Sequence, residues 1–303
     1  VIQTPHIDAL AADGRLCSQA YVTSSVCAPS RAGLITGRHP CRVGFEANLN
    51  HWNERTPTRR EFYGLHPSEA TLADHMRANG YRTVAVGKWH LGDQPGRWPE
   101  DRGFERSYVL HQGGGNHFGL DQLEPVASSP LGTTFSHDGE WTAFPIGAYS
   151  ADEFTNRMIS FLRDAETRDR PFFAYLAFTQ PHWPLQPHAA VTEHYRSRYD
   201  DGPRELERAR RERMAALGFR VDAGDAALVE GDEWASLAET VRQQAASEME
   251  VYAAMVEEMD RNVGRVIAEL RRTGDLENTV IIFINNYHTF AATAVITRQS
   301  ILS

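Results

Sequence analysis

The sequence predicts an α/β fold with a mostly parallel central sheet flanked by helices. Two continuous apolar runs, 171–178 and 279–284, have the length of strands buried on both faces, and a shorter run at 83–86 follows a predicted helix. Helical periodicity separates these runs, and strands that alternate with helices favour parallel pairing. In such sheets ligands bind beyond the carboxyl ends of the strands.

Composition excludes several classes of protein. The chain has 303 residues, of which 41% are hydrophobic, and no apolar run approaches the roughly 20 residues that cross a bilayer, so we expect no membrane span. The 40 acidic and 31 basic residues leave a net charge of −9, which disfavours a nucleic-acid partner. Cys17, Cys27 and Cys41 are too few for a disulfide framework.

Glycines mark the ends of the first two predicted helices. The segment 7–14 carries Leu10 on a short helix, with Gly14 as a left-handed stop. A second helix begins at Cys27, has proline in its first turn and ends at Gly37. Cys27 is therefore expected at a helix N-terminus.

The next segment predicts a helix followed directly by a strand. Ser68 is expected to cap a helix that stops at Asn79, and the strand 83–86 leads into Gly87-Lys88-Trp89-His90. The glycine-rich and aromatic segment 102–115 is expected to form loops.

The remainder alternates helices with the two apolar strands. A charged surface insertion is expected in its middle. The predicted elements are a helix over 152–168, the strand 171–178, the insertion 188–232 with a helix at 204–213, a long helix over 234–272 that covers the sheet and stops at Gly274, and the strand 279–284.

A short motif carries the most specific signal. Cys27-Ala28-Pro29-Ser30-Arg31, with Leu34, Thr36 and Gly37, resembles the sulfatase signature C-x-P-S-R-x-x-x-L-x-T-G. The resemblance continues through 4–8, 80–92 and 178–184. The chain is therefore identified as a member of the type I sulfatases, which implies an alkaline phosphatase-like sandwich for a catalytic domain over 1–286. The tail 287–303 lacks the resemblance.

The resemblance also implies a modified nucleophile. In this family a maturation enzyme converts the signature cysteine, here Cys27, into formylglycine. One hydroxyl of the hydrated aldehyde attacks sulfur, and the second expels sulfate from the sulfated enzyme intermediate. Without the resemblance, a lone cysteine at a helix N-terminus is more often a buried apolar residue or a thiolate.

Four basic residues complete the candidate catalytic set. Arg31 lies one helical turn after Cys27, and Lys88 and His90 are two positions apart beyond a strand end, so each pair can face one side. By resemblance Arg31 holds the formylglycine hydrate or the sulfate oxygens, Lys88 binds the sulfate and His90 contacts the formylglycine hydroxyl. His182 follows a strand in a proline-rich loop, where an imidazole can protonate the leaving oxygen.

The expected metal site departs from the family pattern. The resemblance implies one divalent cation, usually calcium, held by an Asp-Asp pair, the formylglycine from Cys27 and an Asp-Asn pair. The first pair is expected upstream of Thr4, outside the printed chain. At the second pair the chain has Asn286 and Tyr287, so Asn286 replaces the family aspartate. Hard cations of this kind need about six to eight oxygen ligands.

Three functions remain open. The leading one is hydrolysis of aryl or carbohydrate sulfate esters, and the second is a phosphonate monoester or phosphodiester hydrolase of the same superfamily. The third is a degenerate, non-catalytic protein, because of Asn286 and Tyr287. His117 and Asn116 are candidates to line a substrate pocket. The resemblance implies a periplasmic, extracellular or lysosomal location.

Overall fold

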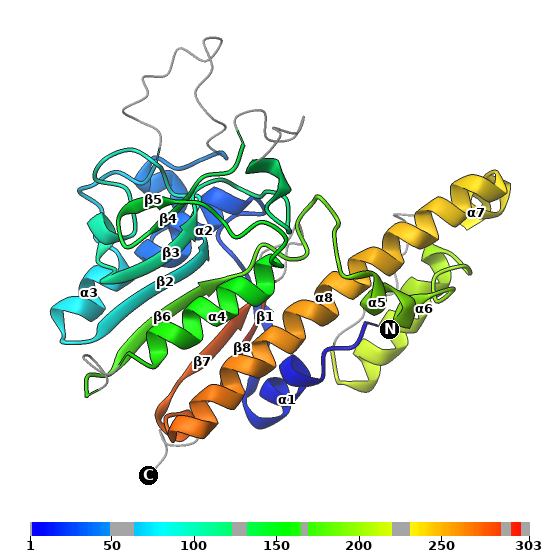
Figure 1. The fold of residues 1–303 in the computed structure, drawn as a ribbon. Coiled ribbons are helices and arrows are strands. Elements are labelled where there is room, and N and C mark those ends of the chain that lie inside the picture. Colours follow the sequence, from blue (N-terminus) through cyan, green and yellow to red (C-terminus); the bar gives the residue numbers. More distant parts are fainter. Residues whose placement is uncertain are drawn as a thin grey trace.

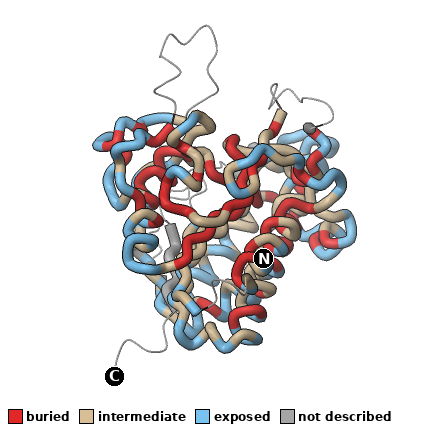
Figure 2. Tube along the Cα trace, turned by 60° about the vertical axis from the view of Figure 1, so that its left-hand side comes forward, coloured by how far each residue is buried: buried red, intermediate tan, exposed pale blue. Residues whose placement is uncertain are grey.

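A computed structural model describes residues 2–48, 64–122, 132–164, 169–219, 231–285 and 292–297. The described chain forms two sheets, and helices lie on both faces of the larger one (Figure 1). Its buried segments run through the middle of the molecule, whereas the exposed ones lie at turns and outer helices (Figure 2). Among these residues no helix is long and apolar enough to cross a membrane.

The main sheet has five strands in the order β5-β4-β3-β2-β6. The strands are β2 (Arg82–Lys88), β3 (Arg106–Leu110), β4 (Phe135–His137), β5 (Glu140–Thr142) and β6 (Phe172–Ala177). The central strand β2 pairs in parallel with β3 and β6, while β4 and β5 add antiparallel pairs. The sheet is therefore mixed, and it is parallel where β2 carries candidate site residues.

A second sheet has only antiparallel pairs among the described residues. It joins β1 (Arg15–Ala20), β8 (Ala292–Thr297) and β7 (Ile281–Ile284) in the order β1-β8-β7. The prediction of a buried strand at 279–284 was wrong, because β7 is only partly buried and Ile282 is 56% exposed. Strand β8 lies within the tail 287–303.

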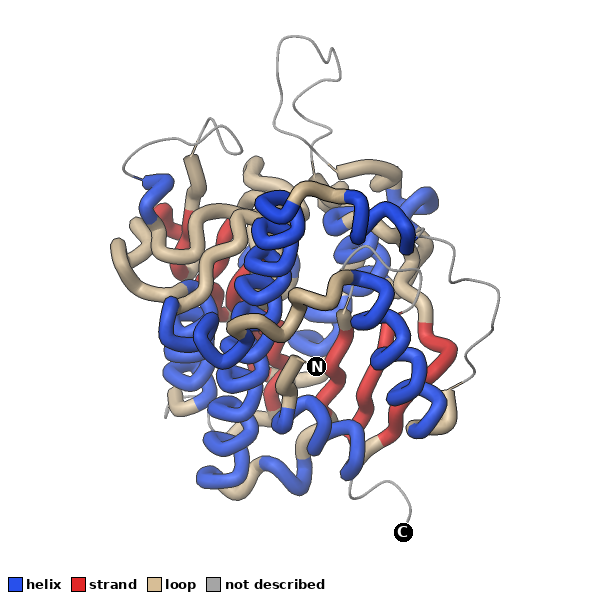
Figure 3. Tube along the Cα trace, turned by 90° about the vertical axis from the view of Figure 1, so that its right-hand side faces the viewer, coloured by secondary structure: helices blue, strands red, loops and turns tan. Residues whose placement is uncertain are grey.

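Helices cover the main sheet on both faces. The α-helices of the described residues are α1 (Pro5–Asp13), α2 (Cys27–Thr36), α3 (Leu72–Ala78), α4 (Ser150–Leu162), α5 (Ala189–Thr192), α6 (Pro203–Ala216), α7 (Gly231–Ser236) and α8 (Glu239–Thr273). On one face Ala28 and Ile35 of α2 pack against Trp89 and Phe104. On the other face α4 and the end of α8 contribute to a second apolar core, and the layer of helices in front of the strands is visible in Figure 3.

Several local predictions are confirmed. The strand at 83–86 is part of β2, whose seven residues are all buried, and the helix that begins at Cys27 ends at a left-handed Gly37. Gly274 likewise ends α8 in the left-handed conformation. The helix at 204–213 lies within α6, which has no buried residues, as expected of a charged surface segment.

Other boundaries differ from the predictions. Gly14 is not left-handed, and Thr71 rather than Ser68 caps α3, because Thr71 and Asp74 form a reciprocal capping box. The loop prediction for 102–115 missed β3, which is a central strand. The helix predicted over 152–168 ends at Leu162, residues 165–168 lie outside the described part, and α7 precedes α8 as a separate helix.

Candidate active site

The end of β2 places Lys88 and His90 at the candidate site. A side chain at Gly87 would put its Cβ 2.1 Å from the Ala177 carbonyl oxygen, so only glycine lets β2 approach β6 this closely. Lys88 is buried at the end of the strand, and His90 has a φ of 55°, in the left-handed region. Between them Trp89 is fully buried and donates from Nε1 to the Arg97 carbonyl oxygen at 2.9 Å.

Helix α2 brings Cys27 and Arg31 to the same strand end. Cys27 is the first residue of the helix, and Asn48 Oδ1 accepts a hydrogen bond from the Ala28 backbone nitrogen at 3.0 Å. Arg31 is buried and donates from Nη1 to the Lys88 carbonyl oxygen at 2.7 Å and to the Tyr175 hydroxyl at 2.8 Å. These bonds tie α2 to both β2 and β6.

The loop after β6 supplies the fourth basic residue. His182 lies in this loop, and its Nδ1 is 2.6 Å from the Trp183 carbonyl oxygen. A carbonyl oxygen only accepts, so Nδ1 carries a proton and Nε2 is the atom left to meet a substrate. His182 and His90 both interact with the Cys27 thiol.

Electrostatics make this cluster suited to negative charge. Burial opposes ionisation of the Cys27 thiol, but hydrogen bonds from His182 and His90 and the charge of Lys88 lower its pKa to about 4. Burial, together with the nearby Arg31, lowers the pKa of Lys88 to about 8. Burial lowers the pKa of His90 to about 4, so its imidazole is neutral at neutral pH. The Cys27 sulfur occupies the position that oxygen atoms on Cβ would take if residue 27 were modified.

The described residues do not fit a calcium site. Among them there is no group of three or more His, Cys, Asp or Glu side chains that could hold a metal ion. The side chains that act on Cys27 are basic, whereas calcium prefers several carboxylate and carbonyl oxygens. Asn286 and Tyr287, which the sequence placed at the metal, lie outside the described residues.

Sequence reasoning missed four residues that support the site. Gly113 and Gly114 pack against His90 and His182, because a Cβ at either glycine would come within 2.7 or 2.8 Å of those imidazole rings. The glycine run was a usable signal for such close packing. Tyr175, which holds Arg31, and Asn48 gave no local signal.

The idea that His117 lines a substrate pocket is corrected. His117 is 1% exposed, with Nδ1 2.8 Å from Ser150 Oγ and Nε2 3.0 Å from the His182 carbonyl oxygen. Its ring therefore belongs to the packing behind the His182 loop. Asn116 is half-buried, and its side-chain oxygen accepts from the Phe118 backbone nitrogen at 2.9 Å.

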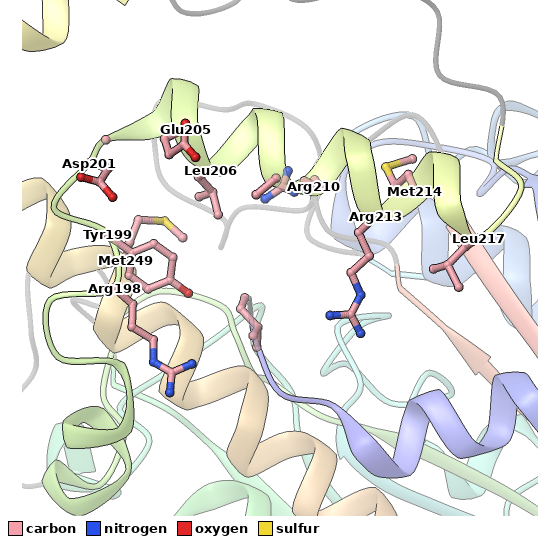
Figure 4. Close-up of a pocket in the computed structure, with 13 residues that line it drawn as sticks. Arg198, Tyr199, Asp201, Glu205, Leu206, Arg210, Arg213, Met214, Leu217 and Met249 are labelled. Carbon is pink, nitrogen blue, oxygen red and sulfur yellow. The ribbon is translucent and has the colours of Figure 1, made fainter.

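A separate cavity lies away from these residues. It has a volume of about 330 Å³ and is bounded by α6, α8 and the segment at Ile2. Figure 4 shows Arg198, Tyr199, Arg210 and Met249 around it, and none of the predicted site residues lines it. This cavity is therefore separate from the Cys27 site.

The sequence of this chain matches a known family. The chain matches the family Sulfatase over residues 1–285 and belongs to it. It is 37% identical over 297 residues to an uncharacterized sulfatase of Schizosaccharomyces pombe, covering 94% of this chain and 53% of that protein. It is 34% identical over 288 residues to an arylsulfatase of Klebsiella aerogenes, covering 94% of this chain and 61% of that protein. The chain thus spans less than two thirds of either relative.

Solved structures agree on the fold. The crystal structure of Ps i-CgsB in complex with k-i-k-neocarrahexaose superposes with a TM-score of 0.68 at 26% identity, covering 94% of this chain and 53% of that one. The phosphonate monoester hydrolase of Agrobacterium radiobacter superposes with a TM-score of 0.58 at 20% identity, covering 98% of this chain and 63% of that one, and shows the fold alone. The α/β fold is that of sulfatases in the alkaline phosphatase-like superfamily.

Proposed function

We propose that the complete protein hydrolyses sulfate esters at the Cys27 cluster, through a formylglycine made from Cys27. The observation that carries the proposal is the convergence of Lys88, His90 and His182 on Cys27 from a strand end and a separate loop. Arg31 adds a second buried cation, and its Nε has no hydrogen-bond partner within the described part of the chain. A buried guanidinium nitrogen without a partner favours an anionic ligand.

Each residue has a defined task in this proposal. Formylglycine at position 27 supplies one hydroxyl of its hydrate to attack sulfur and a second to expel sulfate as the aldehyde re-forms. Lys88 and Arg31 hold the sulfate oxygens, where charge develops as the bond to the alcohol breaks. His182 acts in its doubly protonated form: Nδ1 keeps its proton on the Trp183 carbonyl oxygen and Nε2 gives its proton to the leaving oxygen. Neutral His90 accepts or donates a hydrogen bond at the attacking hydroxyl.

The substrate class is proposed from relatives. The family contains enzymes named arylsulfatase and N-acetylgalactosamine-6-sulfatase, the latter 30% identical over 215 residues in the human protein, with 68% of this chain and 40% of that protein covered. Aryl or carbohydrate sulfates are therefore the first compounds to test. Besides a substrate, the proposal requires a maturation enzyme that converts Cys27 into formylglycine.

Two measurements test the proposal on the complete protein. Peptide mass spectrometry should find formylglycine at position 27, and cysteine at 17 and 41, after expression with a maturation enzyme that converts a control sulfatase. Purified protein should then hydrolyse nitrophenyl sulfate faster than nitrophenyl phosphodiesters or phosphonate monoesters. The reverse preference would favour the phosphonate or phosphodiester hydrolase, and an unmodified Cys27 with no turnover of either would contradict both.

A further inference from the structure

The loop that carries His182 is held from behind by a buried polar network. The carbonyl oxygen of His182 accepts a hydrogen bond from His117 Nε2 at 3.0 Å. Two residues earlier, Gln180 donates from Nε2 to Ser150 Oγ at 2.8 Å. Buried hydrogen bonds therefore hold the loop at the residues on both sides of Pro181.

His117 bonds the loop through the proton on its Nε2. Its Nε2 faces a carbonyl oxygen and must carry the proton, so Nδ1 accepts from Ser150 Oγ or from Gln180 Nε2, which lie at 2.8 and 3.2 Å. Burial lowers the pKa of His117 to about 4, which keeps the ring neutral and preserves this arrangement. Protonation would keep the Nε2 bond to the loop but would make Nδ1 a donor, so that Gln180 Nε2 would lose its acceptor on the ring.

The network is fixed to a rigid helix. The Ser150 backbone nitrogen donates to the His117 carbonyl oxygen at 2.8 Å, and Ser150 is the first residue of α4. Phe154 and Met158 of the same helix lie in the apolar core beneath the sheet. The His117 backbone nitrogen is held in turn by Gln186 Oε1 at 2.9 Å. A displacement of the loop would therefore break several buried hydrogen bonds at once.

The imidazole of His182 has little freedom once its backbone is placed. Its Nδ1 bonds the next carbonyl oxygen in the chain, and Gly114 packs against the ring so closely that a Cβ there would lie 2.8 Å from Nδ1. The position of the His182 backbone thus decides where Nε2 points. A bond to that backbone from His117 acts directly on the geometry of proton transfer.

We infer that His117 is a positioning residue for His182, setting the place from which Nε2 protonates the leaving oxygen. The inference rests on the proposed function, because it assigns His117 a task in the same reaction. His117 does not touch the reacting atoms, and its effect passes through the main chain of the loop. Proton transfer is sensitive to such placement, since an error of about 1 Å can cost about a hundredfold in rate.

Two amide substitutions separate the bond to His182 from the rest of the network. Gln at 117 can place a donor near the position of Nε2, whereas Asn reaches only as far as Nδ1. In the complete, formylglycine-containing protein, His117→Asn should lower kcat/KM for an alkyl sulfate about ten- to a hundredfold and for nitrophenyl sulfate by less than about threefold. His117→Gln should restore most of the alkyl sulfate activity.

Coupling to His182 distinguishes positioning from general stability. In a His182→Ala background, His117→Asn should cause no further loss on the alkyl sulfate, because the group that it positions is absent. His111→Asn is the matched control: His111 is also buried and its Nε2 bonds Ser136 Oγ at 2.8 Å, outside the His182 loop. This control should leave the ratio of the two substrate rates unchanged.

Three results would overturn the inference. Equal losses on both sulfates for His117→Asn, no recovery with His117→Gln, or additive losses with His182→Ala would each make His117 a structural residue only. In all of these cases wild-type turnover of nitrophenyl sulfate leaves the proposed function intact. Failure of the wild type to hydrolyse any sulfate would instead remove the proposed function, and the inference with it.

Discussion

The ends of β2 and β7 are built in different ways. Strand β2 has parallel partners on both sides and seven buried residues, and Lys88 and His90 at its end meet Cys27. Strand β7 pairs only with antiparallel β8 among the described residues, and Ile282 faces solvent. The sequence led us to expect functional groups at both ends, the anion-binding residues after β2 and Asn286 after β7.

This difference shows what holds a functional group in place. A strand paired on both sides and covered on both faces leaves its terminal residues little freedom, and Arg31 adds a hydrogen bond to the Lys88 carbonyl oxygen. A partly exposed strand lacks this support. The described structure therefore contains the basic cluster around Cys27, whereas Asn286 lies outside the described residues. The five changes below test that contrast, in order of decreasing effect.

Loss of the nucleophile at the end of β2 should have the largest effect. Cys27→Ala in the complete protein should reduce turnover of nitrophenyl sulfate by about 10⁴-fold or more, since neighbouring groups cannot replace a missing nucleophile. Cys17→Ala and Cys41→Ala are the controls and should retain activity. Cys27→Ser should allow at most one sulfation event per enzyme. Near-normal turnover by Cys27→Ala would show that the active site is not at the end of β2.

Loss of the proposed general acid should have the next largest effect, and the size of that effect should depend on the substrate. His182→Ala should slow an alkyl sulfate by about a hundredfold or more, but nitrophenyl sulfate far less, because an activated phenolate departs without a proton. Steady-state rates over a series of leaving groups measure the difference. The same loss for leaving groups of widely different pKa would give His182 a binding role.

Truncating a side chain near β2 should destabilise the protein more than truncating one on β7. Ile35 of α2 is 2% exposed in the core behind Cys27, so Ile35→Ala should lower the free energy of unfolding by about 2–5 kcal/mol. Ile282→Ala on β7 should cost less than about 1 kcal/mol, because that side chain is already largely in water. Chemical denaturation of both variants compares them directly. Equal costs would mean that β7 is covered in solution.

Ion pairs stabilise the end of α8, the helix that precedes β7 in the chain. Glu269 of α8 accepts bidentate hydrogen bonds from Arg163 and Arg272 at 2.6–2.9 Å, which lower the pKa of its carboxyl group. Both arginines are more than half exposed, so screening by water limits the stabilisation, and Glu269→Gln should cost about 1 kcal/mol at neutral pH.

The pH dependence of this variant gives a second test. A depressed folded-state pKa contributes stability above the unfolded value of about 4.3, and that stability is lost as the pH falls below it. Wild type and Glu269→Gln should therefore differ most above about pH 5 and converge in acid. A difference that grows as the pH falls would contradict the assigned ion pairs.

Calcium should have the smallest effect on the 303-residue chain. The side chains that act on Cys27 are basic, so about 5 mM calcium should raise the melting temperature by less than about 1 °C. Magnesium serves as the control for non-specific ion effects. A large shift specific to calcium would mean that residues beyond the described ranges, Asn286 among them, complete a metal site with Cys27.

Local signals were enough to predict the elements that carry the site. The glycine at 37 predicted the end of α2, and the apolar run before Gly87 predicted β2, because caps and periodicity act over a few residues. The motif around Cys27 led to the same family that residues 1–285 match. The helix end, the strand and the motif each depend only on neighbouring residues, so the sequence by itself determined them.

The tertiary structure decided which elements meet. Nothing local showed that Tyr175 holds Arg31 or that His117 bonds the His182 loop, since the paired residues lie 144 and 65 positions apart. The pairing of β7 with β8 and the strand hidden in the glycine-rich segment before Gly113 likewise depend on sheet register. Local propensity carries no information about register or about which distant side chains pack together, because these contacts form only when the whole chain has folded.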